Sequence, residues 1–230
     1  MSERLFNILV SSFTQILIPG LKVTMPLTLA SFALSLVIGL LLAWVQIANV
    51  PVLKQLAKVY IWIFRGTPLI VQLFIIFFGL PSLGIVLEAF PAAVLGFGLN
   101  LGAYNAEAFR AAIQAVDKGQ LEAAYLIGHS YNKAMARIVL PQAFPIAFPN
   151  LSNNLISLLK DTSLAASITV VELFTVTQQI AARTYEPFAL YMEAAAIYLF
   201  FSTLLTLLQR FLEKKMVFKT KEGMKKGIMI

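Results

Sequence analysis

Side chains that could make or break covalent bonds are scarce in this sequence of 230 residues. It contains no cysteine and one histidine, His129, so thiolate chemistry, iron–sulfur clusters and histidine-based metal sites are not expected. The Gly-Lys dipeptide that a phosphate-binding P-loop requires is missing, as are the motifs of metalloproteases and serine hydrolases. The sequence therefore predicts a protein that is not an enzyme, that needs no cofactor or metal, and that leaves ATP to another chain.

A second group of polar residues lies inside long apolar stretches, where side chains can bind a solute. Asn100, Tyr104 and Glu107 follow one another at helical spacing, and Asn154 lies in a later stretch. Polar groups cost free energy in lipid and usually face a bundle interior or a cavity. We expect these four residues to line a pathway that could hold the ammonium and carboxylate groups of an amino acid. Hydrogen bonding between helices is the simpler explanation for any one of them, and Glu107 would alternatively pair with Arg110.

The elements that position these residues must cross a membrane. The chain is 59% hydrophobic and 13% charged, with a mean hydropathy of +0.82, whereas a soluble domain is about 45–50% apolar and about 25% charged. A soluble fold of this length could not bury so much apolar surface. Spanning takes about 20 mostly apolar residues, and five stretches qualify: residues 23–45, 66–87, 89–113, 138–159 and 187–208. The predicted fold class is an all-α integral membrane protein with about five transmembrane helices.

The chain is expected to form one transmembrane domain with two flanking segments. Residues 1–21 are expected to form an interfacial amphipathic segment, with a sixth spanning helix as the alternative. Residues 22–213 form the transmembrane domain, and residues 214–230 a basic cytoplasmic tail. Most of the 18 Lys and Arg residues fall in segments on one side, which places the N-terminus outside and the C-terminus in the cytoplasm. The same distribution accounts for the net charge of +7 without nucleic-acid binding.

The longest cytoplasmic loop, residues 114–141, carries a spaced pattern. It has Glu-Ala-Ala, then Gly after three residues, then Ile-x-Leu-Pro after nine more; the fixed positions are Glu122, Ala123, Ala124, Gly128, Ile138, Leu140 and Pro141. An acid favours the start of a helix, glycine permits a sharp turn, and proline is tolerated in the first turn of a helix. An ordinary helix-turn-helix loop would be the default explanation from composition alone.

At every fixed position this loop resembles the signature loop of the permeases of ABC importers. The resemblance implies the type I ABC importer permease fold in a bacterial inner membrane. It also implies that the loop docks into a cleft on an ATPase subunit, so that closure of the two ATPases moves the membrane helices. The implied partners are two ATP-binding subunits inside, a solute-binding protein outside, and a second permease copy or a homologue.

Three further stretches are similar to the polar amino-acid branch of that family: residues 64–73, 102–110 and 160–164. Gly66 and Gly102 within them are expected where helices approach closely. The resemblance implies a polar L-amino acid as the transported solute, and residues 160–164 and 183–187 favour cystine. An ion-gradient-driven secondary transporter or channel remains the alternative, and it would not need the docking loop.

Overall fold

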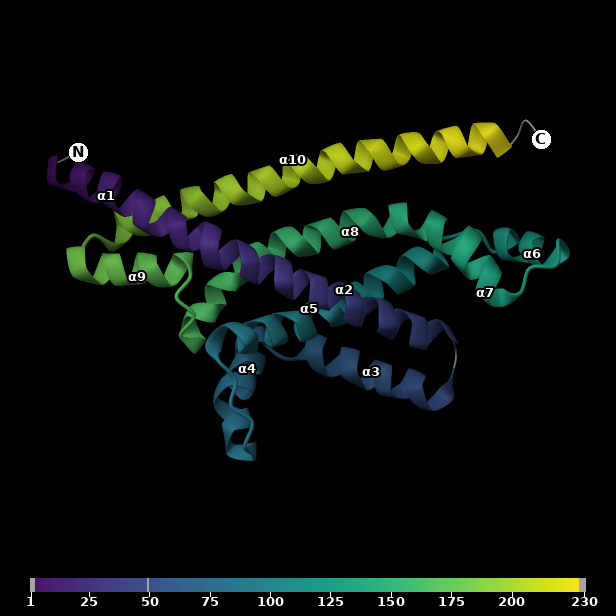
Figure 1. Cartoon of the computed structure of the whole chain (residues 1–230), viewed down its shortest axis with the longest axis horizontal. Coiled ribbons are helices and arrows are strands. Elements are labelled where there is room, and N and C mark those ends of the chain that lie inside the picture. The colour runs from purple at the N-terminus through teal and green to yellow at the C-terminus, as the bar shows by residue number, and fades with distance from the viewer. Residues whose placement is uncertain (1–2, 49, 228–230) are drawn as a thin grey trace.

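The computed structural model describes residues 3–48 and 50–227, and every regular element within these residues is a helix. Figure 1 shows most of the helices running roughly along the long axis of the molecule, so that segments far apart in sequence form one bundle. Helices α6 and α7 lie at the end of the molecule that also holds the C-terminus, and the N-terminus lies at the opposite end. The expected all-α fold is thereby confirmed.

The N-terminal helix is longer than the sequence predicts. Helix α1 (Glu3–Pro19) continues through the π-helical turn η1 (Gly20–Thr24) into α2 (Met25–Ala48), so that the unbroken helix from Glu3 to Ile47 is 45 residues long. Residues 1–21 are therefore not separated from the first span; α1 packs on α9 and α10 instead. The polar positions that suggested an interfacial helix include Ser12, which is buried. Residues 1–2, and residues 228–230 of the basic tail, lie outside the described residues.

The second expected span is broken. Helix α3 (Pro51–Gly66) ends at Thr67, whose extended backbone is typical of a residue before proline. Pro68 then precedes α4 (Leu69–Phe74), the π-helical turn η2 (Ile75–Gly79) and the 3-10 turn η3 (Leu80–Leu83). The helical direction bends by 107° between Pro51–Gly66 and Leu69–Leu83. The sequence predicts a single apolar stretch over residues 66–87. It does not include α3, the other half of this bent pair, because α3 carries Lys54 and Lys58.

Helix α5 (Ala89–Gln114) packs along α2 at the centre of the bundle. A Cβ atom added to Gly102 would lie 2.6 Å from Cγ2 of Ile38, so only glycine permits this approach. The expectation of close packing is confirmed for Gly102. It is wrong for Gly66, around which a Cβ atom would meet nothing within 4 Å. Gly66 instead ends α3 just before the bend.

The remaining elements complete the bundle: α6 (Lys118–Leu126), α7 (Tyr131–Ala134), the π-helical turn η4 (Met135–Val139), α8 (Leu140–Asp161), the 3-10 helix η5 (Thr162–Ile168), α9 (Leu173–Thr184) and α10 (Pro187–Gly227). A buried carboxylate joins α9, α10 and the turn η1. Glu172 caps α9 by accepting the N–H of Thr175 at 2.8 Å, and it accepts the hydroxyl of Tyr198 at 3.0 Å and that of Thr24 at 3.3 Å. The side-chain oxygens of Glu172 are thus hydrogen-bonded inside the protein.

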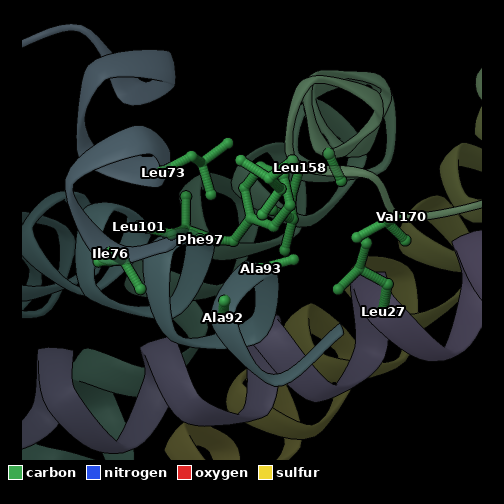
Figure 2. Close-up of a cluster of buried hydrophobic side chains, with 11 residues drawn as sticks. Leu27, Leu73, Ile76, Ala92, Ala93, Phe97, Leu101, Leu158 and Val170 are labelled. Carbon is green, nitrogen blue, oxygen red and sulfur yellow. The ribbon is translucent and has the colours of Figure 1, made fainter. Parts of the chain in front are cut away.

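The main apolar core lies where α2, α4, α5 and α8 converge. Figure 2 shows Leu73, Phe97 and Leu158 pointing toward one another, with Leu27 and Val170 beside them. Phe97 and Leu73 are fully buried. Because lipid is as apolar as these side chains, close packing rather than expulsion of water holds such a core together.

Length and composition identify several helices that can span a membrane. Two qualify as single helices, namely Glu3–Ile47 and Pro187–Met216. Two bent pairs raise the number to four if each is one span: Pro51–Gly66 with Leu69–Leu83, and Tyr131–Ile168 with Leu173–Thr184. Helix α5, which corresponds to the third expected span, has 26 residues and is about 39 Å long at 1.5 Å per residue, which is long enough to cross a membrane.

Candidate functional site: the 114–141 loop and the polar groups of the bundle

The loop over residues 114–141 begins with a capped helix. Asp117 is the N-cap of α6, and its carboxylate accepts the N–H of Gly119 at 2.7 Å. An acidic N-cap satisfies an otherwise unpaired N–H and complements the helix dipole. Glu122 lies in the middle of α6 rather than at its start, and Asp117 performs the capping role that the sequence suggested for an acid.

Gly128 forms the turn between α6 and α7 with a left-handed φ of +80°. The Gly128 N–H donates to the carbonyl of Tyr125 at 2.9 Å, and the His129 N–H donates to the carbonyl of Ala124 at 3.0 Å. This pair of bonds is the Schellman arrangement that ends helices at glycine. The expected sharp turn at Gly128 is confirmed, and its backbone bonds hold the end of α6 in one conformation.

The second half of the loop leads directly into the bundle. Helix α7, the turn η4 and α8 follow one another without interruption. Pro141 lies in the first turn of α8. The continuous helical run, however, starts ten positions earlier at Tyr131, so Pro141 does not begin it as expected. The amide of Gln142 donates to the side-chain oxygen of Gln120 at 3.3 Å, which ties α6 to the base of α8.

The surface of the loop combines the expected residues with apolar ones. Glu122 and Ala123 are exposed, whereas Ala124 is buried against the rest of the loop. Leu126 is 89% exposed and Ile127 is 72% exposed. These two neighbouring side chains form a small exposed apolar surface at the end of α6. Sequence reasoning missed both residues, although an apolar pair next to a turn glycine was a visible signal.

Beside this turn lies a shallow hollow of about 380 Å³, lined by Gly128, Ser130, Asn132, Lys133, Ala136 and Arg137. Its two basic residues give it a positive charge. Among the described residues, no group of three His, Asp or Glu side chains could hold a metal ion.

The amide of Asn100, on α5, is hydrogen-bonded to groups beside the bend between α3 and α4. It donates to the carbonyl of Phe64 and to Oε1 of Gln72, both at 3.0 Å. The amide of Gln72 donates to the Phe64 carbonyl at 3.0 Å and to the Thr67 hydroxyl at 2.8 Å. A break before proline frees backbone carbonyls, which must find partners within a membrane. Asn100 and Gln72 supply those partners.

Asn154 belongs to a second polar chain that crosses three helices. Its amide donates to Oδ1 of Asn105 at 2.8 Å, and the amide of Asn105 donates to the hydroxyl of Ser35 at 2.8 Å. Asn105 is fully buried. This chain joins α8, α5 and α2, so it fixes how these helices pack.

Tyr104 and Glu107 differ from the two asparagines because they border open space. Tyr104 is 40% exposed, and the guanidinium group of Arg65 lies 5.2 Å from the centre of its ring. Glu107 pairs with Arg110 at 2.7 Å, as the alternative interpretation anticipated, and both side chains are partly exposed. Together these groups form a charged and aromatic strip on α5 and at the end of α3.

The fold and the loop have counterparts among known proteins. Residues 35–218, which include the whole loop and all four candidate pathway residues, match the family described as the binding-protein-dependent transport system inner membrane component. The chain is 44% identical over 212 residues to the L-cystine transport system permease protein TcyB of Bacillus subtilis (strain 168), covering 92% of this chain and 91% of that protein. It is 44% identical over 209 residues to TcyL, named likewise and from the same organism, covering 86% and 87%.

Among solved structures, a chain from the crystal structure of an amino acid ABC transporter with histidines superposes with a TM-score of 0.85 and 34% sequence identity, over 94% of this chain and 100% of that chain. The match covers the bundle and the loop alike. Both the sequence and the three-dimensional arrangement therefore assign this protein to the binding-protein-dependent transport system inner membrane components, the permeases of ABC importers.

Proposed function

We propose that this chain is the permease subunit of an ATP-driven importer for polar L-amino acids, with cystine as the first candidate. As a member of its family it is a multi-pass inner-membrane permease, and ATP is hydrolysed on a separate subunit. The proposal for the substrate class is supported by two relatives at 44% identity that are named for L-cystine. The structural neighbour at 34% identity is an amino acid transporter.

The observation that carries the mechanism is the exposed, glycine-terminated end of α6. Glu122, Ala123, Leu126 and Ile127 present a small acidic and apolar surface at the tip of the loop. In the proposed mechanism, this surface docks into a cleft on an ATPase subunit. Movement of that subunit then reaches α8 through the turn at Gly128 and through η4.

The proposed complex holds two permease subunits, two ATPase subunits and a solute-binding protein. The second permease subunit is either another copy of this chain or a homologue. With the loop in the cytoplasm, the N-terminus lies outside and the C-terminus inside, as the distribution of Lys and Arg also favours. The solute-binding protein then meets the end of the bundle where α1 begins and α9 lies.

The solute pathway is proposed to pass along the strip formed by Tyr104, Glu107 and Arg65. Tyr104 is accessible, and a carboxylate beside guanidinium groups can attract both charged ends of an amino acid. Asn100 and Asn154 are proposed to act on the pathway indirectly. Their amides already bind other helices, so they would hold the walls in place.

Uptake in cells tests this proposal. Labelled cystine, glutamine, arginine and histidine would be offered to cells with and without the gene, before and after ATP depletion. We expect one of these solutes to depend on both the gene and ATP. Uptake that depends on the gene but survives ATP depletion, and that collapses with an uncoupler, would instead identify an ion-gradient-driven transporter.

A further inference from the structure

An apolar groove runs between α10 and the middle of the bundle. It encloses about 350 Å³ and is lined by parts of α2, α5, α8 and α10, including Leu36, Phe109, Phe144, Phe148, Leu205 and Leu208. Of its fifteen lining residues only Ser152 and Gln209 are polar. An apolar cavity of about 150 Å³ already holds a benzene molecule, so this groove has room for a longer hydrocarbon.

The groove ends in polar and basic groups on the side that the proposed orientation places in the cytoplasm. The amide of Gln209 donates to Oδ1 of Asn153 at 3.3 Å and to Oε1 of Glu213 at 2.9 Å. Just beyond, α10 carries Arg210, Lys214 and Lys215, all exposed. Lys215 follows the groove residue Leu212 by three positions and therefore shares its face.

These three bases have excess positive charge. Among the residues whose side chains are described, 3–47 and 50–216, none forms an ion pair with Arg210, Lys214 or Lys215. Glu213 is the one acid among these three bases, so positive charge remains in excess there. Basic clusters at the cytoplasmic ends of membrane helices attract anionic lipid headgroups.

The groove and the proposed pathway lie on different sides of the bundle. Figure 1 shows α10 at one edge and α3 with α4 at the opposite edge, with α2, α5 and α8 between them. The strip around Tyr104 and Arg65 belongs to α5 and α3. A second permease subunit that completes the pathway at that strip would leave the groove beside α10 facing the bilayer.

We propose that this groove is a binding site for an anionic phospholipid of the cytoplasmic leaflet. One acyl chain lies in the groove against Phe144, Phe148 and Leu208. The phosphate headgroup lies at the cytoplasmic end near Arg210, Lys214 and Lys215. The apolar lining favours binding of an acyl chain, and the bases favour a negatively charged headgroup over a neutral one.

Two adjacent leucines of α10 provide a matched pair of variants. Leu208 lines the groove and is 52% exposed, whereas Leu207 lies outside it and is 56% exposed. Leu208→Trp should fill the groove, and Leu207→Trp should place the same side chain into bulk lipid. The full-length protein is purified in detergent with its accompanying subunits, and retained phosphatidylglycerol and phosphatidylcholine are counted by native mass spectrometry.

We expect the unsubstituted protein and Leu207→Trp to retain phosphatidylglycerol in preference to phosphatidylcholine, and Leu208→Trp to lose that retention. Arg210→Gln, Lys214→Gln and Lys215→Gln should each weaken the preference for phosphatidylglycerol roughly fivefold, the effect expected of one base near an anionic lipid. Equal retention by the two tryptophan variants would overturn the proposal, as would charge variants that keep the preference.

A second measurement identifies a competing occupant of the groove. The chain has no cysteine, so Leu208→Cys introduces one unique thiol for cross-linking in native membranes. We expect no cross-link between two permease subunits at this position. Efficient cross-linking between two copies would show that a second permease subunit covers the groove, and would overturn the lipid assignment.

Discussion

Replacing Gly128 with alanine should weaken the association of this permease with its ATPase. Gly128 has a φ of +80°, and a Cβ atom placed there would meet nothing within 4 Å. Steric overlap with neighbouring groups is therefore absent, and the cost of the change is purely that of the left-handed backbone. For a residue other than glycine this cost is about 1–2 kcal/mol.

That cost sets the expected size of the effect. A penalty of about 1–2 kcal/mol lowers the ratio of native to alternative turn conformations by a factor of about 5–30. The apparent affinity for the ATPase falls by the same factor at most, when only the native turn can dock. Gly128→Asn should be milder, because asparagine enters the left-handed region more readily.

Gly84 supplies the control for this experiment. It also has a φ of +80° and also has open space around it, but it lies after η3, away from the loop. The assay measures titration of the purified ATPase onto the permease in detergent, followed by ATP-dependent uptake in proteoliposomes. Gly84→Ala should leave the titration unchanged. Equal affinities for Gly128→Ala, Gly84→Ala and the unsubstituted protein would refute the assignment of the turn as the docking site.

Four other substitutions test how the helices are held. Gly102→Leu should lower the thermal midpoint of the purified protein, at about 1–3 kcal/mol of overpacking; an unchanged midpoint would contradict the close approach of α2 and α5. Asn105→Ala should cost about 1 kcal/mol, since it removes two interhelical bonds of about 0.6 kcal/mol each. Adding Asn154→Ala to that variant should cost little more, and additive losses in a double-mutant cycle would argue against a shared chain. Glu172→Ala should destabilise the start of α9 by about 0.5–2 kcal/mol through loss of its cap, which faster amide hydrogen exchange there would report and unchanged exchange would contradict.

The sequence predicted those features that depend on local chemistry. Long apolar stretches identified the helical membrane fold, and the spacing around Gly128 identified the turn, because a left-handed residue without a side chain is needed there. Gly102 was correctly assigned to a close helix contact. The pairing of Glu107 with Arg110 followed from their separation of three residues on one helix.

Features that depend on packing between distant segments were not predictable in this way. The bend at Pro68 placed Asn100 beside Gln72, so its amide serves the broken backbone rather than open space. Asn154 reaches Asn105 only because α8 packs against α5. Glu172 drew no attention in the sequence, since its partners Thr24 and Tyr198 come from opposite ends of the chain. Ser12 of α1 likewise meets a distant residue, because its hydroxyl donates to Oε2 of Glu193 on α10 at 2.6 Å.

Reconstitution tests the central claim most directly. The permease would be placed in proteoliposomes with its ATPase and its solute-binding protein, and uptake of labelled cystine would be measured with ATP, without ATP, and with an imposed ion gradient alone. The account predicts uptake that requires ATP and the binding protein and that is lost when the loop end is altered by Leu126→Asp together with Ile127→Asp. Uptake of any polar amino acid driven by the ion gradient alone, and unaffected by that change, would contradict it.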